Sequence, residues 1–392
     1  MPHPALARDS LRAIAGSRIR EVANAAMGST DLLAFWFGEP ASPTPAFVVE
    51  AAKAALDAND TFYLPNLGIT ELRSELAGYV EHLHPPSAAA TDRIAVTSSG
   101  VAALMLASQA LLSPGDRVVA VVPLWPNLTS IAAVLGARVE TVALTVDAKN
   151  GGWTLDLDRL LAALTSDTRL LMINSPGNPT GWVMPAFAQK VVIEHCRRLG
   201  IWVVSDEAYE RLVFNGNQCA PSFLDVADPD DRLVVANTFS KTWQMTGWRL
   251  GWLVTPKALL PDIEKLIEFN TSCAPGFVQR AGLAAVRHGE AATRSFVATV
   301  REGADTLMTA LSALPRVQAV RPDGAMYVLL RVEGELDSLE LAKALARQAR
   351  LGLAPGIAFG PECEGYLRWC IARPPATLHE GVERLAGFLA TR

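Results

Sequence analysis

The most informative stretch of this sequence is Thr238-Phe239-Ser240-Lys241-Thr242-Trp243-Gln244-Met245-Thr246-Gly247-Trp248-Arg249. Its lysine follows an apolar run with strand composition and has hydroxyl and aromatic neighbours. Desolvation would lower the pKa of such a lysine and make its amine a nucleophile toward a carbonyl group. The hydroxyls of Thr238 and Ser240 and the guanidinium of Arg249 suit a phosphate, which accepts several hydrogen bonds. A surface Lys241 and a structural Arg249 remain the alternative at this point.

A second informative segment is Ile201-Trp202-Val203-Val204-Ser205-Asp206-Glu207-Ala208-Tyr209, an apolar strand that ends in an acid. A buried aspartate is unfavourable unless a cation meets it. A protonated pyridine nitrogen would be such a partner, and Asp206 would hold it protonated so that the ring withdraws electrons. Tyr209 could donate to a phenolate oxygen of the same ring. The alternative is that Asp206 caps a following helix.

Two more segments lie directly after predicted strands. The first, Asn174-Ser175-Pro176-Gly177-Asn178-Pro179-Thr180-Gly181, is rich in turn-forming residues and holds the amide of Asn178 at a strand end. The second, Thr97-Ser98-Ser99-Gly100-Val101-Ala102-Ala103-Leu104, joins a strand to a helix. Its small residues leave backbone N–H groups free at a helix N-terminus, where phosphates bind.

Strand-like and helical segments alternate around these motifs. The predicted strands are Ile94–Ser98, Arg117–Val122, Arg138–Leu144, Arg169–Asn174, Ile201–Ser205, Leu233–Asn237 and Arg249–Thr255. Helical segments between most of them are Gly100–Leu112, Asn127–Leu135, Asp156–Leu164 and Pro185–Leu199. This alternation predicts an α/β fold with a mainly parallel seven-stranded sheet between helices, in which the last strand need not run parallel. Ligands of such sheets lie beyond the carboxyl ends of the strands.

The last hundred residues have a different pattern. A long helix is predicted over Gly289–Leu314, followed by short strands and two more helices, which is an α+β arrangement. We therefore predict a large α/β domain over residues 47–288. A smaller α+β domain would combine residues 1–46 with residues 289–392.

Taken together, these motifs resemble the fold-type-I pyridoxal-phosphate aminotransferases of class I/II, the aspartate aminotransferase-like group. The resemblance runs from about Ser17 to the C-terminus. It implies that Lys241 forms the Schiff base with pyridoxal 5'-phosphate and moves a proton in catalysis, and that Asp206 holds the pyridine nitrogen. It also implies cofactor contacts from Gly100, Val101, Trp125, Asn178, Tyr209, Thr238, Ser240 and Arg249. For Trp125 a place in the core remains the alternative.

The resemblance extends to the substrate and to a second subunit. Arg368 in Gly365-Tyr366-Leu367-Arg368-Trp369 is similar to the arginine that holds the substrate α-carboxylate, with Asn178 and the backbone of Gly38 beside it. Ile19 is a candidate for the side-chain pocket. Tyr63 resembles the tyrosine that reaches the phosphate of the neighbouring subunit, which implies a homodimer with shared active sites. A structural Arg368 is the alternative.

The implied activity is the transfer of an amino group between an α-amino acid and a 2-oxo acid. Carbon–sulfur β-lyases and other eliminating enzymes share this fold and remain an alternative, as does, more remotely, a regulatory ligand-binding module. Two departures concern substrate choice: Ala102 replaces a lysine of some relatives, and residues 265–270 contain no arginine. The sequence therefore predicts a weak preference for dicarboxylates, with Arg18, Arg20 and Arg280 as the candidate cations otherwise.

Composition agrees with an ordinary soluble globular protein, and the cysteine pattern favours a reducing cytoplasm. The 392 residues carry a formal net charge of −5 without a basic cluster, so no nucleic-acid partner is expected. No run of about 18 apolar residues occurs, so no membrane span is expected. The five cysteines form no C-x-x-C pair, which predicts neither disulfides nor a metal site.

Overall fold

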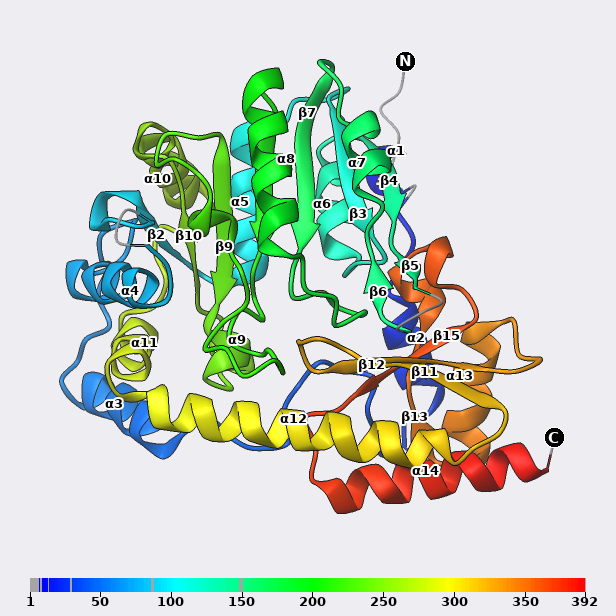
Figure 1. Cartoon of the computed structure of the whole chain (residues 1–392). Coiled ribbons are helices and arrows are strands. Elements are labelled where there is room, and N and C mark those ends of the chain that lie inside the picture. The colour runs from blue at the N-terminus through cyan, green and yellow to red at the C-terminus, as the bar shows by residue number, and fades with distance from the viewer. Residues whose placement is uncertain are drawn as a thin grey trace.

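The structure is a computed structural model that describes residues 7, 9–12, 14–28, 30–85, 88–147 and 151–391. Its largest sheet has seven strands in the order β2-β10-β9-β8-β7-β3-β4 (Figure 1). These are β2 (Ile94–Thr97), β3 (Arg117–Val122), β4 (Arg138–Ala143), β7 (Thr168–Asn174), β8 (Trp202–Asp206), β9 (Leu233–Thr238) and β10 (Gly251–Val254). The predicted α/β fold with a mainly parallel seven-stranded sheet is confirmed.

One strand of this sheet runs against its neighbours. The pairs β3–β4, β3–β7, β7–β8 and β8–β9 are parallel, whereas β10 is antiparallel to both β9 and β2. This strand also begins two residues later than the sequence predicts. Arg249 has a φ of 55°, in the left-handed region, which interrupts an extended backbone.

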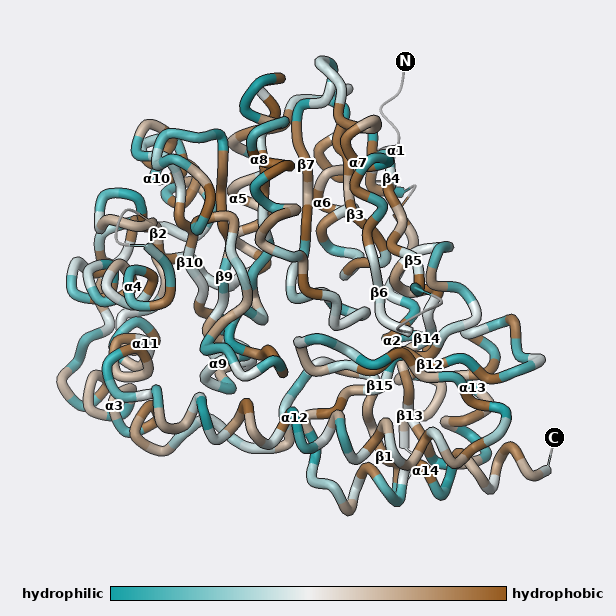
Figure 2. The backbone as a smooth tube through the Cα atoms, in the orientation of Figure 1, coloured by the Kyte–Doolittle hydropathy of each residue, from teal (hydrophilic) through white to brown (hydrophobic). Residues whose placement is uncertain are grey.

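Both faces of the sheet are covered by helices, which explains the continuous apolar runs of its strands. Along β7, Leu170 and Met172 join one buried cluster and Leu171 and Ile173 join the other, because successive side chains point to opposite faces. Figure 2 shows the hydrophobic colouring along β3 and β7. The first face is covered by α5 (Gly100–Leu111), α6 (Asn127–Val134) and α10 (Leu260–Asn270). The second is covered by α4 (Thr70–Leu83), α7 (Leu157–Ala163), α8 (Ala186–Leu199) and α11 (Gly276–His288).

A second, antiparallel sheet is formed near the C-terminus, in the order β11-β12-β15-β14. Its strands are β11 (Val317–Val320), β12 (Tyr327–Val332), β14 (Ala354–Pro355) and β15 (Tyr366–Cys370). The helices of this part are α12 (Glu290–Ser312), α13 (Ser338–Gln348) and α14 (Pro375–Ala390). In Figure 1, α12 runs from beneath the large sheet to the small one.

The N-terminal segment packs onto this C-terminal part. The helix α2 (Arg18–Ala25) contacts α13 and β14, and β1 (Leu33–Ala34) pairs in parallel with β13 (Leu351–Gly352). Division into domains at residues 46/47 and 288/289 stays a prediction. No helix of the described residues is long and apolar enough to span a membrane.

Candidate active site

A cavity of about 380 Å³ lies where the two parts of the molecule meet. Asn174, Asp206 and Thr238 are the last residues of β7, β8 and β9, and all three line it. Residues from the N-terminal arm and from the small sheet complete its wall, including Gly38 and Arg368. All predicted site residues except Tyr63 line this cavity: Ile19, Gly38, Gly100, Val101, Trp125, Asn178, Asp206, Tyr209, Thr238, Ser240, Lys241, Arg249 and Arg368.

Lys241 lies in α9 (Phe239–Thr242), the short helix that begins directly after β9. Its Nζ donates to the backbone oxygen of Gly38 at 2.6 Å and lies 5.7 Å from the ring centroid of Tyr209. Burial disfavours the charged ammonium and lowers the pKa of Lys241 to about 8. The amine is therefore far closer to its nucleophilic form at neutral pH than an exposed lysine is.

Asp206 ends β8 and is only 6% exposed. Its Oδ1 accepts from the backbone N–H of Ala208 at 3.1 Å, but the residues that follow form a turn and no α-helix begins there. Burial raises the pKa of Asp206 to about 6, although the Ala208 amide and the charge of Lys241 oppose the shift. No basic side chain of the described residues forms an ion pair with Asp206, so the charge of Lys241 acts on this buried carboxylate only from beyond ion-pair distance.

A chain of hydrogen bonds joins the strand ends of the large sheet to the small sheet. The side chain of Asn174 accepts from the Asn178 backbone N–H at 2.7 Å and donates to the backbone oxygen of Asp206 at 3.0 Å. Oδ1 of Asn178 in turn accepts from Nη1 of Arg368 at 2.8 Å. Asn178 is 5% exposed, so its position is set from both sides.

Arg368 lies in the middle of β15 and is 2% exposed. Nη2 donates to the backbone oxygen of Trp36, and the guanidinium carbon lies 4.3 Å from the ring centroid of Tyr327 and 4.8 Å from that of Phe359. Its Nε has no hydrogen-bond partner, and within the described chain no acid pairs with it. A buried guanidinium without a carboxylate is costly, which suits a site that binds an anion.

The first turn of α5 lines the cavity with backbone N–H groups that could donate to an anion. Ser99 caps this helix by accepting from the Ala102 N–H at 3.0 Å, and the Gly100 and Val101 amides belong to the turn that lacks intrahelical acceptors. A Cβ at Gly100 would lie 2.9 Å from Cβ of Thr238, so only glycine allows this approach. The Thr238 hydroxyl bonds Ser240 Oγ at 2.9 Å.

Arg249 also lines this side of the cavity. Its Nη1 donates to the backbone oxygen of Thr246 at 2.7 Å, and its side chain remains exposed. Trp125 is half-buried and lines the same cavity instead of lying wholly within the core.

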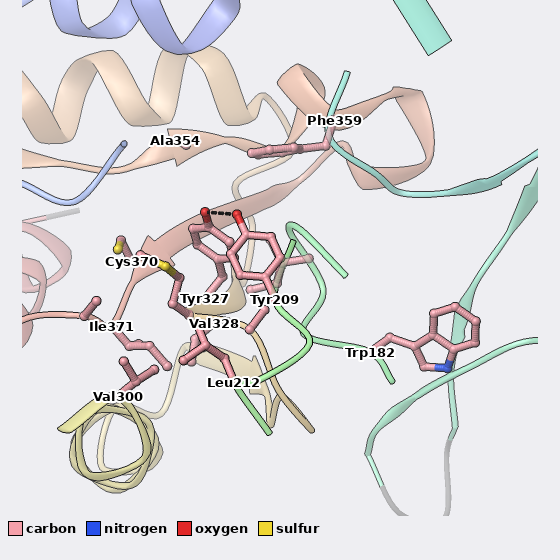
Figure 3. Packing of buried hydrophobic residues seen from close by; sticks show 14 of the residues in the cluster. Trp182, Tyr209, Leu212, Val300, Tyr327, Val328, Ala354, Phe359, Cys370 and Ile371 are labelled. Atoms are coloured by element: carbon pink, nitrogen blue, oxygen red, sulfur yellow. Dashed lines mark hydrogen bonds between the residues drawn. The ribbon is translucent and has the colours of Figure 1, made fainter. Parts of the chain in front are cut away.

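Sequence reasoning missed Tyr327 and Trp36. The hydroxyls of Tyr209 and Tyr327 lie 2.7 Å apart, as Figure 3 shows. A Cβ at Gly38 would lie 1.9 Å from the Tyr327 hydroxyl, so this glycine permits the close contact. The apolar run of β12 and the residues around Trp36 contain no local signal for the contact of Tyr327 with Tyr209 or of Trp36 with Arg368. Both contacts join residues that are distant in the sequence.

Tyr63 is 89% exposed and lies outside the cavity of its own chain.

The three candidate cations for a distal carboxylate differ in their partners and in their position relative to the cavity. Arg18 pairs with Glu21 at 2.8 Å, and Arg280 pairs with Asp60 at 3.0 Å and with Glu71. Arg20 lines the cavity.

Comparison with known proteins gives a consistent result. The family described as aminotransferase class I and II matches residues 30–385. The aspartate/prephenate aminotransferase of Thermus thermophilus is 35% identical over 92% of this chain and 91% of its own length. The probable aspartate aminotransferase of Methanocaldococcus jannaschii is 31% identical over 95% and 96%. The solved aspartate aminotransferase of Thermotoga maritima superposes with a TM-score of 0.90 at 29% identity, covering 98% of this chain and 100% of that one.

Proposed function

This chain belongs to the class I and II aminotransferases, and from that premise we propose how its residues carry out transamination. The enzyme transfers an amino group between an amino acid and a 2-oxo acid. We propose that pyridoxal 5'-phosphate is its cofactor and that Lys241 carries it. The observation that supports this most is the presence, in one cavity, of a lysine with lowered pKa and a buried carboxylate that forms no ion pair with the described residues.

The residues present suit this cofactor. Asp206 offers a negative charge to a protonated ring nitrogen, which would relieve the cost of its burial. The first turn of α5, the hydroxyls of Thr238 and Ser240, and Arg249 offer N–H and O–H donors to a phosphate. The indole of Trp125 offers a flat apolar surface for the ring. When bound, pyridoxal phosphate supplies an electron sink beside the substrate Cα.

In this proposal the α-carboxylate of the substrate binds to Arg368. Its guanidinium is already held by Asn178 Oδ1 and Trp36 O, so little rotational freedom is lost when the substrate binds. Nε has no hydrogen-bond partner among the described residues, which leaves it as a donor for a carboxylate oxygen. A planar guanidinium suits this task better than a lysine because it donates two parallel hydrogen bonds.

Proton movement is assigned to Lys241. As a neutral amine, its Nζ would take the proton from the substrate Cα, and the resulting ammonium would give a proton back to the carbon that accepts it later in the half-reaction. A pKa of about 8 allows it to act as a base near neutral pH. The backbone oxygen of Gly38 accepts from Nζ and orients it.

Asn178 and Tyr209 are assigned to the phenolic oxygen of the cofactor. Tyr209 is bonded to Tyr327, so its hydroxyl direction is restricted before any ligand arrives. Asn178 uses Oδ1 for Arg368, which leaves its amide nitrogen as the donor. This arrangement couples the ring site to the carboxylate site through one side chain.

We further propose a homodimer in the cytoplasm. Tyr63 is exposed and outside its own cavity, which suits a role toward a partner chain. A second groove shares Glu39, Thr246 and Arg249 with the active-site cavity, so a partner seated there would border the phosphate side. The five cysteines are unpaired, as a reducing compartment requires.

The experiment is a half-reaction. Purified protein loaded with pyridoxal phosphate is mixed with single amino acids without an acceptor, and cofactor and products are quantified. Stoichiometric pyridoxamine phosphate and 2-oxo acid support the assignment. Continuous release of pyruvate and ammonia from a β-substituted amino acid would instead identify an eliminating enzyme.

A further inference from the structure

Four basic side chains line the active-site cavity: Arg20, Lys241, Arg249 and Arg368. The proposed function gives a task to three of them, at the cofactor carbonyl, the phosphate and the α-carboxylate. Arg20 has no task in that scheme. Its position in the cavity therefore indicates that a further anionic group binds there.

The backbone of Arg20 is firmly placed. It lies in the first turn of α2, where Ser17 Oγ accepts from its N–H at 3.3 Å. The preceding residue, Ile19, is 8% exposed and also lines the cavity. Because α2 packs against α13 and β14, the arginine projects from an anchored helix.

The side chain of Arg20 lies beside the place proposed for the substrate. Its guanidinium carbon is 5.9 Å from the ring centroid of Phe37, which lines the same cavity. Phe37 lies between Trp36, whose backbone oxygen binds Arg368, and Gly38, whose backbone oxygen binds Lys241. Arg20 thus stands next to the segment that connects the α-carboxylate site with the catalytic amine.

The charge of Arg20 is not used by the protein itself. Arg18, two residues before it, pairs with Glu21 at 2.8 Å, whereas Arg20 forms no side-chain hydrogen bond or ion pair with the described residues. Glu39 also lines the cavity, but no ion pair joins it to Arg20. The Arg20 side chain is exposed and its guanidinium meets Phe37 through a ring contact, which leaves its N–H donors available.

We propose that Arg20 is the specificity-determining residue that binds a carboxylate at the far end of the substrate side chain. The inference rests on the proposed function and gives its substrate class: amino acids and 2-oxo acids with acidic side chains. It also revises the weak dicarboxylate preference expected from Ala102 and residues 265–270. Those two positions lack a cation, but the N-terminal arm of the same chain supplies one.

The test compares acidic donors with their neutral amides, which have nearly the same shape. Glutamate is paired with glutamine, and aspartate with asparagine, in the wild type and in Arg20→Gln, Arg20→Lys and Arg18→Gln variants. We expect Arg20→Gln to lower kcat/KM for the acidic donors roughly 10- to 100-fold, the scale of hydrogen bonds to a charged group. The amides should change by less than about threefold, and Arg20→Lys should retain part of the preference.

Arg18→Gln is the matched control, because it removes a positive charge from the same helix turn but not from the cavity. It should leave the ratio of acidic to amide donors as in the wild type. Equilibrium binding gives a second measurement: glutarate and its monoamide glutaramate are titrated against the holoenzyme. Arg20→Gln should weaken glutarate only.

The outcomes separate the two proposals. If no donor is transaminated, the proposed function fails, and the binding comparison still judges Arg20. If transamination occurs but Arg20→Gln affects acidic and amide donors equally, or affects neither, the assignment of Arg20 is overturned. A general loss of stability in a variant would lower its activity with acidic and amide donors equally. It would therefore leave the ratio between the two kinds of donor unchanged.

Discussion

Nη1 of Arg368 and Oδ1 of Asn178 lie 2.8 Å apart although 190 positions separate the two residues. One belongs to the small sheet and the other follows β7 of the large sheet, so their hydrogen bond joins the two parts of the molecule at the cavity. A substrate carboxylate held by Arg368 is thereby placed at a set distance from the groups that hold the cofactor ring. With the proposed roles of Arg368 and Asn178, the relative position of the two parts of the molecule would set the distance between substrate and cofactor.

The first prediction concerns the α-carboxylate. Arg368→Leu should lower kcat/KM for amino acids, with a loss of roughly 2–5 kcal/mol of transition-state binding energy. The reason is that the substrate α-carboxylate would lose its buried charge partner. Amines without a carboxylate should lose little. Arg331→Leu is the matched control, since Arg331 lies on the adjacent β12 but outside the cavity. Equal losses for amino acids and amines would assign Arg368 a structural role instead.

The second prediction concerns the site of cofactor attachment. Borohydride reduction of the yellow holoenzyme should leave a pyridoxyl group on the peptide that contains Lys241. Lys241→Ala should reduce turnover by at least about 10²–10⁴-fold, the usual cost of removing a general base. Peptide mass spectrometry locates the label. Its recovery on Lys257 or Lys265, both exposed, would contradict the assignment.

The third prediction follows from the lowered pKa of Lys241. Only the neutral amine attacks an aldehyde, so capture of pyridoxal phosphate by the apoprotein should accelerate with pH and level off above about 8. An ordinary lysine would continue to gain about tenfold per pH unit up to pH 10. Stopped-flow absorbance measures the rates, with Nα-acetyl-lysine as the reference amine that corrects for titration of the cofactor. Parallel pH profiles for protein and reference would show that burial does not tune this lysine.

The fourth prediction concerns stability and Asp206. Burial raises its folded-state pKa to about 6 from an ordinary 3.8, so its contribution is most favourable below pH 3.8 and is lost as pH rises through 6. In the apoprotein at pH 8, Asp206→Asn should therefore raise the free energy of unfolding, by up to about 3 kcal/mol. The holoenzyme should show the reverse, because the variant loses the charge that faces the ring nitrogen.

Thermal unfolding of apoprotein and holoenzyme at pH 5 and pH 8 measures this difference. Asp231→Asn serves as the control of opposite sign, since Asp231 pairs with Arg197 at 2.6 Å and its neutralisation should destabilise both forms. An apoprotein of Asp206→Asn that melts below the wild type at pH 8 would show that the carboxylate is already compensated.

The fifth prediction concerns the shared site. If Tyr63 serves the partner chain, mixing Lys241→Ala with Tyr63→Ala subunits places both lesions in one site of each heterodimer and none in the other. Random pairing makes half of the dimers mixed, so about a quarter of wild-type activity should return. Mixing Lys241→Ala with Arg368→Leu is the control, since both residues line one chain's cavity and no intact site can form. Unchanged activity, with heterodimers confirmed by mass spectrometry, would assign Tyr63 to its own chain.

Much of the fold and of the candidate site could be predicted because the signals are local. Apolar runs of strand composition mark the central strands to within a few residues, since each buried strand must be apolar on both faces. Parallel strands then bring their carboxyl ends to one edge of the sheet. This is why Asn174, Asp206 and Thr238 line one cavity although they belong to separate motifs.

Other features were decided by tertiary structure alone. The sequence does not distinguish Arg18, Arg20 and Arg280 as candidate cations, yet of these three only Arg20 lines the cavity. Arg18 and Arg20 lie in α2, whose packing on α13 determines which of them faces inward, and Arg280 lies in α11 and pairs with Asp60. Tyr327 enters the site through its contact with Tyr209, 118 positions away. Secondary structure depends on neighbours a few residues apart, whereas these contacts depend on how separate elements pack and in what register. The sequence by itself therefore determined the strands, the polar residues at their carboxyl ends and the family. Packing between distant segments decided the strand order and which side chains share the cavity.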